Sequence, residues 1–387
     1  MSSFGPFRIA DKTAGCERTF IIAEIGQNHQ GDMDMAKKMI ATSKAIGADC
    51  VKFQKSCLKE KFTEAALQRV YDGENSWGRT YGEHKTYLEF TIEQYKILQE
   101  FASELDIIFT ASAMDVQSLQ ELQQINVPVI KIGSGDANNV TLLSTAAKHP
   151  TPLIISTGMQ SEEMVRRIVE IMESNAKDNF CLLHCVSSYP TEPKDVCLRM
   201  INYYRNKFPG ICIGYSGHEQ GIAISIAAVL LGAKIIERHF TLDKKQKGTD
   251  HNLSLEPNEF KEMISRIRDA ERISKDDMEN EQILEIISRW SHATEVDNVR
   301  LALSGVAQKK ILDCEMMCRM KLGKSLVYAK SLSRGPILTT DMIVAKVSEP
   351  FGISAERFDN FIGQRLVVDV RAEENLMENH FISNNED

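Results

Sequence analysis

Two lysines inside apolar runs, together with hydroxyl side chains that end other runs, predict a pocket for a small anion. Lys52 and Lys131 each lie in a short apolar stretch, where an ammonium group is costly to bury without an opposite charge beside it. A bound phosphate or carboxylate would supply that charge, and nearby hydroxyl and amide groups would complete its hydrogen bonds. A single serine or threonine can equally well satisfy a loop backbone, so the prediction depends on the whole set. Such hydroxyls follow other apolar runs at Thr110, Ser134, Ser156 and Ser216.

His218 and His239 are candidates for binding a divalent metal ion. Each follows an apolar run, and neutral imidazole is a common ligand of divalent transition metals. A pair of histidines that leaves coordination positions open is typical of a catalytic rather than a structural site. Because the chain contains nine histidines, two unrelated core or surface histidines are the alternative interpretation.

Glu24 ends another apolar run and is a candidate for moving protons. A carboxyl group buried in the mouth of a pocket has a raised pKa and can act as a general acid or base. The alternative is that Glu24 forms an ion pair with one of the pocket lysines, and both roles can hold at once.

An alternation of short β-rich runs and helical stretches covers the first two thirds of the chain and must position these residues. Between the runs, apolar residues recur at intervals of three and four, as in SEEMVRRIVEIMES. A β-run, a helix and another β-run imply parallel strands with right-handed crossovers. Eight such units in roughly 250 residues predict an α/β fold, a closed (β/α)8 barrel whose active rim collects the strand-end residues. A doubly wound open sheet is the alternative, but its first turn is usually glycine-rich, whereas this chain has EIGQNHQGD. The eight runs are Phe20–Ala23, Cys50–Phe53, Ile107–Phe109, Val129–Ile132, Leu153–Ile155, Phe180–Leu183, Ile211–Gly214 and Lys234–Glu237.

The pattern divides the chain into four segments. We expect the barrel at residues 1–274, a charged and partly helical linker with little core at 275–310, a small β-rich module at 311–383, and a frayed tail at 384–387. Short β-runs and a Gly-Pro turn indicate the module. The second and third β-runs are separated by residues 55–105, and a long loop at that place in a barrel lies over the active face and is often functional.

Composition and charge exclude several classes of partner. The chain has 387 residues and a formal charge of -8, which gives no general attraction to nucleic acid or to an anionic membrane. We therefore expect neither as a partner, and an anionic substrate must be held by a local basic pocket. No apolar run is long enough to cross a bilayer, and the N-terminus lacks the apolar core of a signal peptide. Nine scattered cysteines fit a reducing compartment, so we expect a cytoplasmic location.

Seven short motifs, in order along the chain, resemble those of one enzyme family. They are FIIAEIGQNHQGD, GADCVKFQ, KIGSGD, ISTGM, IGYSGHE, ERHFTLD and GTDHNLSLEP. These motifs resemble the sialic acid (N-acetylneuraminate) synthases, and the C-terminal module resembles their antifreeze-like (SAF) domain. The segment WGRTYGEHKTYLEF is similar to the animal branch. The resemblance implies a transferase that condenses phosphoenolpyruvate with N-acetylmannosamine 6-phosphate to N-acetylneuraminate 9-phosphate and phosphate, with mannose 6-phosphate as a further candidate acceptor.

The same resemblance implies roles for the candidate residues. His218 and His239 would hold the metal, for which manganese is expected, with magnesium and cobalt as alternatives. Glu24, Tyr189 and Asp250 would contact the sugar, and Glu24 and Asp250 are the competing candidates for catalytic proton transfer. The residues implied to contact phosphoenolpyruvate are Lys52, Thr110, Lys131, Ser134, Ser156, Ser187 and Ser216.

Two places depart from the family pattern, and the phosphate of the acceptor sugar needs further cations. Ser187 stands where the bacterial members have asparagine. The bacterial members also place an arginine of the module, in an Arg-Pro-Gly context, on the sugar, whereas residues 348–352 here read SEPFG. Lys346 or Arg357 are the candidates to replace that arginine. For the phosphate of the acceptor sugar we expect Arg79 and Lys85 on the long loop.

The resemblance also implies a homodimer in which the module of one subunit covers the barrel mouth of the other. Two other functions remain open at this point. One is a different phosphoenolpyruvate-condensing synthase, making seven-carbon or eight-carbon sugar acids, although such enzymes normally lack the module. The other is a non-catalytic carbohydrate-binding protein with an idle barrel.

Overall fold

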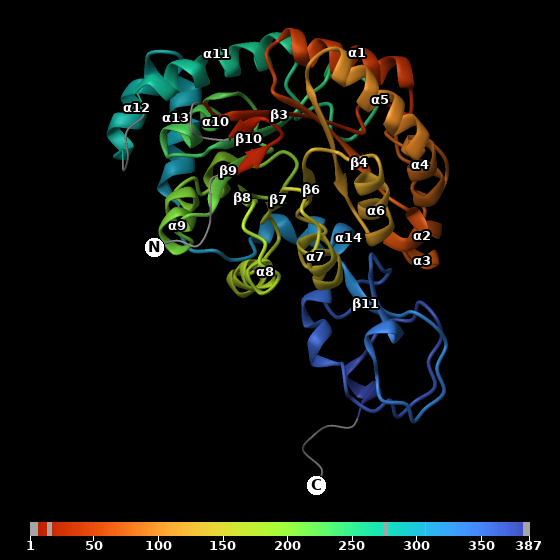
Figure 1. Ribbon diagram of the computed structural model, residues 1–387. Helices are drawn as coiled ribbons and strands as arrows, with labels where there is room; N and C mark the ends of the chain where they lie inside the picture. The colour runs from red at the N-terminus through yellow and green to blue at the C-terminus, as the bar shows by residue number, and fades with distance from the viewer. Residues whose placement is uncertain (1–6, 14–17, 274–277, 306, 382–387) are drawn as a thin grey trace.

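The larger part of the chain is a barrel of parallel strands surrounded by helices (Figure 1). The computed structural model describes residues 7–13, 18–273, 278–305 and 307–381. Within this part, eight strands form one closed sheet in which each strand pairs with the next, and the last closes on the first. This confirms the predicted (β/α)8 barrel, and each expected β-run overlaps one strand. The barrel strands are β3 (Phe20–Gly26), β4 (Cys50–Lys55), β5 (Ile108–Ala113), β6 (Ile130–Ile132), β7 (Leu153–Ser156), β8 (Phe180–Cys185), β9 (Cys212–Gly217) and β10 (Ile235–His239).

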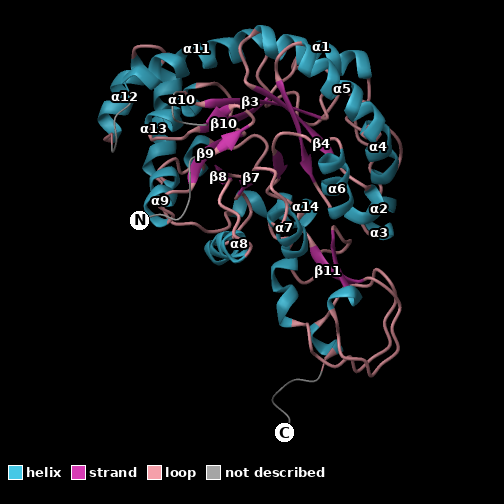
Figure 2. Ribbon diagram, viewed as in Figure 1, coloured by secondary structure: helices cyan, strands magenta, loops and turns pink. Residues whose placement is uncertain are grey.

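Helices cover the outside of the barrel as a second layer (Figure 2). Most are amphipathic, because one face meets the strands and the other meets water. In α8, for example, Val165, Ile168 and Met172 are buried, whereas Arg166 is exposed. The helices of this layer are α1 (Met33–Ala45), α5 (Ile92–Glu104), α6 (Val116–Gln124), α7 (Val140–Ala147), α8 (Glu162–Ser174), α9 (Met200–Lys207), α10 (Ala223–Leu230) and α11 (Pro257–Ile273).

Two further helices correct the expectation of a linker with little core at residues 275–310. Helix α12 (Asn280–Ser288) and helix α13 (Ala293–Ser304) pack against α10. Their buried side chains, including Ile283, Ile287 and Val299, belong to the same apolar cluster as the barrel. The helical spacing of these residues supplies an apolar face, and α10 is buried along its whole length because this pair covers it. The segment is therefore part of the barrel's outer packing.

The amino end of the barrel is closed by a hairpin that the sequence analysis did not predict. Strands β1 (Arg8–Ile9) and β2 (Lys12–Thr13) pair antiparallel, and Phe7 and Ile9 are buried among residues of the barrel interior such as Phe20 and Ile154. This plug keeps water away from one end, so the barrel opens only toward the carboxyl ends of its strands.

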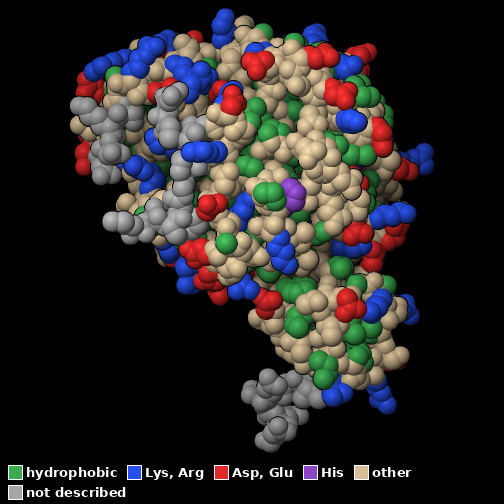
Figure 3. All heavy atoms as spheres, in the orientation of Figure 1, with side chains coloured by type: hydrophobic (Ala, Val, Ile, Leu, Met, Phe, Trp, Pro, Cys, Tyr) green, Lys and Arg blue, Asp and Glu red, His purple; other side chains and the backbone are tan. Residues whose placement is uncertain are grey.

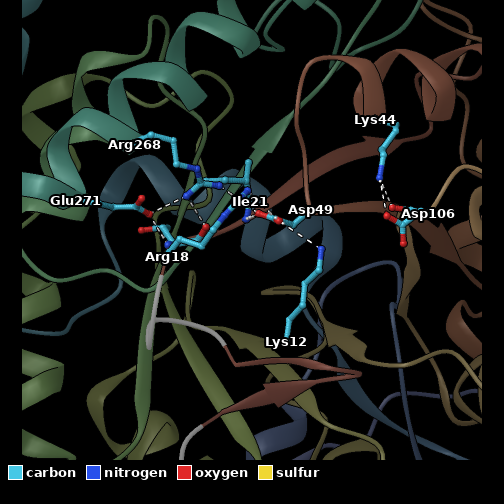
Figure 4. A network of polar contacts seen from close by, with 9 residues as sticks. Lys12, Arg18, Ile21, Lys44, Asp49, Asp106, Arg268 and Glu271 are labelled. Atoms are coloured by element: carbon cyan, nitrogen blue, oxygen red, sulfur yellow. Dashed lines mark hydrogen bonds and ion pairs between the residues drawn. The ribbon is translucent and has the colours of Figure 1, made fainter.

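A charged network beside this plug joins the first strands to the last helix of the barrel (Figure 4). Asp49, at the start of β4, accepts a hydrogen bond from the backbone N–H of Ile21 and forms ion pairs with Lys12, Arg18 and Arg268. Asp49 is buried, so each of these partners offsets part of its desolvation. The network stabilises the seam where the barrel closes, far from the strand ends that carry the candidate site.

The long loop between β4 and β5 folds into helices over the open end of the barrel. It contains α2 (Leu58–Lys61), α3 (Glu64–Gln68) and α4 (Tyr81–Leu88) before α5 begins. Helix α4 starts with a capping box, in which the side chains of Thr80 and Glu83 satisfy each other's backbone N–H groups. Gly78 lies just before this helix with φ at +111°. Residues other than glycine disfavour this conformation.

The C-terminal module has its own core and is joined to the barrel by α14 (Met316–Leu322). Strands β11 (Ser325–Tyr328) and β12 (Ile343–Lys346) pair antiparallel, and short bridges and 3-10 turns complete the module. This confirms the predicted small β-rich unit after the barrel. Val347 forms a parallel bridge with Phe62 of the long loop, so module and loop are in contact. The expected tail at 384–387 lies outside the described residues.

In the described part of the chain, no helix combines the length and the apolar composition that crossing a membrane requires.

Candidate active site

A cavity of about 370 Å³ lies at the carboxyl ends of the barrel strands and carries an excess of positive charge. Six lysines and four carboxylates line it, although the chain as a whole has a formal charge of -8. Over the outer face shown in Figure 3, by contrast, basic and acidic side chains are interspersed. The cavity is therefore the local basic pocket that an anionic substrate of an acidic protein needs. The sequence-derived candidates that line it are Glu24, Lys52, Lys85, Lys131, Ser134, Ser156, Tyr189, Ser216, His218, His239 and Asp250.

Lys52 and Lys131 lie together deep in this cavity, and both are only 3% exposed. Nζ of Lys52 lies 2.7 Å from Oε2 of Glu24 and 3.0 Å from Oγ of Ser112. Both lysines approach the same carboxylate oxygen, Oε1 of Glu237, at 3.7 Å and 3.6 Å. Strands β4 and β10 both pair with β3, which brings Glu24 and Glu237 to Lys52, whereas Lys131 reaches Glu237 from β6.

Glu237 is a site residue to which the sequence analysis gave no role. Its side chain points into the barrel from β10, two residues before His239, and it accepts a hydrogen bond from Oγ of Ser216. Burial acts to raise the pKa of Glu237, but the ammonium groups of Lys131 and Lys52 outweigh it and hold the pKa at about 2. Glu237 is therefore an ionised internal counter-ion for the lysine pair. The signal that could have found it is the alternation of Glu237 and His239 on one face of a strand.

Glu24 differs from Glu237 in the direction of its pKa shift. Burial raises the pKa of Glu24 above its ordinary value, and this effect outweighs the stabilising influence of Lys52. The other oxygen, Oε1, accepts a hydrogen bond from Nε2 of Gln54 at 2.8 Å. Two buried carboxyl groups with opposite pKa shifts are the arrangement expected where one group keeps its charge and the other exchanges a proton.

Hydroxyl groups at neighbouring strand ends complete the anion pocket. Oγ of Ser156 is buried and has no hydrogen-bond partner among the described residues, so it can donate to a bound oxygen. Oγ of Ser134 accepts from the backbone N–H of Gly158 at 3.0 Å. A Cβ atom at Gly158 would lie 2.3 Å from Oγ of Ser187 and 2.7 Å from Oγ of Ser134, so the turn requires glycine for steric reasons.

His218 and His239 come from the neighbouring strands β9 and β10, and their ring centroids are 5.5 Å apart. Nδ1 of His218 lies 2.9 Å from the carbonyl oxygen of Val186, to which it donates, so Nε2 carries the lone pair. Nδ1 of His239 is buried without a hydrogen-bond partner among the described residues and lies 4.0 Å from Oδ2 of Asp250. Burial lowers the pKa of His239 to about 3, which keeps its ring neutral. Two neighbouring imidazoles, one with an unpaired buried nitrogen, fit a divalent metal ion.

Tyr189 and Asp250 lie around this pair of histidines. The ring of Tyr189 is centred 4.2 Å from that of His218 and 6.3 Å from that of His239. Asp250 accepts a hydrogen bond from the hydroxyl of Thr249 at 2.8 Å. Both residues line the cavity, between the two histidines and its open side, where a second substrate would enter.

Three sequence-derived candidates do not line the cavity. The hydroxyl of Thr110 donates to the carbonyl oxygen of Val129, and it is buried within the barrel wall. Ser187 lies behind the turn at Gly158, and its backbone N–H donates to Glu315. Arg79 is exposed, and its backbone N–H donates to the side chain of Glu83. The structure thus separates Arg79 from Lys85, which lines the cavity.

The two candidates for the missing module arginine also lie elsewhere in this chain. Lys346 forms an ion pair with Glu373 at 2.7 Å, and Arg357 forms one with Glu378. Neither lines the cavity, whereas four other residues of the same region do: Cys318, Lys321, Leu322 and Lys324. The sequence analysis did not identify these lysines, because nothing in CRMKLGK distinguishes them from solvent-exposed charges.

Comparison with known proteins identifies the family. The family model described as "NeuB family" matches residues 39–279. The chain belongs to the NeuB family. It is 50% identical to an N-acetylneuraminate-9-phosphate synthase of Drosophila melanogaster over 95% of this chain and 97% of the relative. It is 48% identical to the N-acetylneuraminate-9-phosphate synthase of Homo sapiens over 93% of this chain and 91% of that protein.

A solved structure is similar to this NeuB family member over both the barrel and the C-terminal module. The spore coat polysaccharide biosynthesis protein SpsE of Bacillus subtilis is similar at a TM-score of 0.78 and 28% identity, covering 98% of this chain and all of that one. Enzymes of the NeuB family are in general metal-dependent, which agrees with the donor set of His218 and His239. The resemblance stated from the motifs is thereby confirmed.

Proposed function

We propose that this NeuB family enzyme condenses phosphoenolpyruvate with the open-chain aldehyde of N-acetylmannosamine 6-phosphate, giving N-acetylneuraminate 9-phosphate and phosphate. The observation that carries the proposal is the pair of buried ammonium groups of Lys52 and Lys131 beside the imidazoles of His218 and His239. The names of the relatives at 48–50% identity support the phosphorylated product.

The lysine pair has the charge to hold phosphoenolpyruvate. Without substrate, Glu237 neutralises part of the positive charge of Lys52 and Lys131. A polyanionic substrate adds stronger charge–charge contacts in a site from which water is excluded. The hydroxyls of Ser156 and Ser134 supply further donors.

The reaction forms one C–C bond and breaks one C–O bond. C3 of phosphoenolpyruvate attacks the aldehyde carbon, and the aldehyde oxygen takes a proton to become a hydroxyl. Water then adds to C2, and the bond from C2 to the phosphate oxygen breaks, so that phosphate leaves. Glu24, whose pKa is raised by burial, is the proposed donor at the aldehyde oxygen, with Asp250 as the competing candidate.

Manganese is the proposed metal, held by His218 and His239, with magnesium and cobalt as alternatives. When bound, such an ion polarises the aldehyde oxygen as a Lewis acid. The ion also explains why two histidines lie side by side in the cavity that holds the proton donor. As part of the same proposal, the enzyme acts in the cytosol.

We also propose that the active form is a homodimer in which the C-terminal module contributes to the partner's barrel mouth. In the single chain, exposed apolar side chains on α14 and the module, including Met317 at 84% and Ile337 at 50% exposed, offer a surface for such a contact. Light scattering of the purified protein measures the oligomeric state, and a monomer at working concentration would contradict this part.

Product identification tests the reaction. The purified enzyme is incubated with manganese, phosphoenolpyruvate and either N-acetylmannosamine 6-phosphate or N-acetylmannosamine, and the products are identified by mass spectrometry. We expect one phosphate released per phosphorylated nine-carbon product. Phosphate release only with shorter aldehyde sugars would indicate a seven- or eight-carbon sugar-acid synthase, and binding without phosphate release would indicate a carbohydrate-binding protein.

A further inference from the structure

A second group of lysines lies in the cavity, apart from Lys52 and Lys131. Its members surround the aromatic ring of Tyr81 on α4. Nζ of Lys85 lies 5.4 Å from the centre of that ring, and Nζ of Lys321 lies 5.8 Å from it. Lys61, at the end of α2, lies close enough for its charge to act on both Lys85 and Tyr81. All three lysines line the cavity.

These three lysines lack carboxylate partners. In the described part of the chain, the structure gives no ion pair for Lys61, Lys85 or Lys321. Nζ of Lys85 donates to Oε1 of Gln27 at 2.7 Å, and Nζ of Lys61 lies 2.7 Å from Sδ of Met114. Two lining carboxylates feel the charge of these lysines without forming an ion pair with them: Asp136 acts on Lys61 but is already paired with Lys324, and Asp250 is influenced by Lys85.

Lys61 carries the largest part of this imbalance. It is only 6% exposed, and burial, together with the neighbouring charges of Lys324 and Lys85, lowers its pKa to about 8. The pKa of the Tyr81 phenol is lowered as well. Burial acts to raise the pKa of Tyr81, but the surrounding cations outweigh it and lower the pKa. A buried ammonium with no anion beside it is costly, so the cluster is arranged for an anion from outside the chain.

We propose that Lys61, Lys85 and Lys321 bind the phosphate ester of the acceptor sugar. The proposal rests on the proposed function, in which the acceptor is phosphorylated. One cavity then contains two groups of lysines because the reaction brings together two anionic substrates. Lys52 and Lys131 hold phosphoenolpyruvate, and the lysines around Tyr81 hold the phosphate at the far end of the sugar.

The phosphate subsite joins two parts of the chain. Lys61 and Lys85 belong to the long loop, whereas Lys321 belongs to α14, which leads into the C-terminal module. The carbonyl oxygen of Lys61 accepts a hydrogen bond from the backbone N–H of Val347 at 2.8 Å, so the module positions the end of α2. The preference for a phosphorylated acceptor therefore depends on how the module docks, and not on the barrel alone.

The test compares the kinetics of phosphorylated and unphosphorylated N-acetylmannosamine in Lys61→Met and Lys321→Met. Methionine keeps the length of the side chain and removes the charge. Lys59→Met is the matched control, because Lys59 lies on the same helix α2 with its side chain exposed and outside the cavity. For both test variants we expect KM of the phosphorylated acceptor to rise about tenfold to a hundredfold. We expect KM of the unphosphorylated acceptor and of phosphoenolpyruvate to change less than about twofold, which also shows that each variant is folded.

The possible outcomes separate this proposal from the proposed function. If the wild-type enzyme prefers the phosphorylated acceptor and both variants keep that preference, the phosphate is bound elsewhere and the subsite is wrong. If both acceptors lose affinity equally, the lysines have a structural role, and the subsite is again wrong. If the wild-type enzyme itself shows no preference for the phosphorylated acceptor, the proposed function fails, and the subsite fails with it.

Discussion

Nζ of Lys131 lies 3.6 Å from Oε1 of Glu237 at the bottom of the cavity. The ammonium comes from β6 and the carboxylate from β10, strands that lie across the barrel from each other. A cation and an anion that meet across the barrel interior keep a buried site folded before substrate arrives. Under the proposed function, the same cation becomes available to an incoming anion, and we expect substrate binding to be an exchange of partners.

Removing the Lys131 ammonium tests this exchange. In Lys131→Met we expect KM of phosphoenolpyruvate to rise at least about tenfold, because a charge-assisted hydrogen bond to the substrate is lost. KM of the acceptor should change little. Steady-state phosphate release measures both constants. Lys234→Met, an exposed lysine just before β10 at the opposite end of the barrel, is the control. Equal KM values for phosphoenolpyruvate in the two variants would contradict the assignment.

The histidine pair predicts a specific metal dependence. We expect one manganese ion per chain in the wild-type protein and at least about a tenfold weaker affinity in His239→Gln, because one of two protein ligands is removed. Electron paramagnetic resonance of added Mn²⁺ measures binding without relying on activity. His292→Gln is the control, since His292 is exposed and lies outside the cavity. Chelation should abolish product formation, and Mn²⁺ should restore it. Retention of the full affinity in His239→Gln would remove this histidine from the site.

The lowered pKa of Lys61 predicts a pH dependence of acceptor binding. Below pH 8 Lys61 is charged and can hold a phosphate, whereas above its pKa of about 8 it becomes neutral. KM of the phosphorylated acceptor should therefore rise as the pH increases from about 7.5 to 9.5. The groups that act on Lys61 are Asp136, Lys324, Lys85 and Tyr81.

Two comparisons isolate the contribution of Lys61 to that pH profile. In Lys61→Met the rise of KM between pH 7.5 and 9.5 should be reduced, and with unphosphorylated acceptor the wild-type enzyme should show no such rise. An identical rise with both acceptors would mean that another group, common to both, is titrating.

A buried ion pair between β10 and the segment that leads into α10 predicts a large loss of stability on mutation. Arg238 and Glu219 are each 1% exposed as side chains and lie 2.9 Å apart. In Arg238→Met the carboxylate of Glu219 is left buried without its partner, so the free energy of unfolding should fall by about 3–5 kcal/mol. Arg272→Met is the control, because its pair with Asp269 is exposed and should contribute less than about 1 kcal/mol. Denaturant titration followed by circular dichroism measures both, and equal losses would contradict the role of the buried pair.

The barrel could be predicted from the sequence because its strands are short, continuous apolar runs separated by helices. Runs such as Phe180–Leu183 are buried on both faces and carry the signal without help from distant residues. The hairpin at Arg8–Ile9 could not be predicted, because each of its strands has only two residues. The helices at 280–304 were taken for a linker because charged residues interrupt them and the stretch before them, although their apolar residues form a face that packs on α10.

The site likewise has features that the sequence predicts and features that only the fold reveals. The sequence by itself determined which residues end the strands, and so placed Glu24, Lys52, Lys131, His218 and His239 on one rim. Only the tertiary structure decided that Glu237 lies beside both lysines and that Lys85 and Lys321 share the ring of Tyr81. The physical reason is that the sequence of strands along the chain, and the alternation of side chains within each strand, are local properties. Charge balance in a buried pocket depends instead on groups that lie far apart in the sequence.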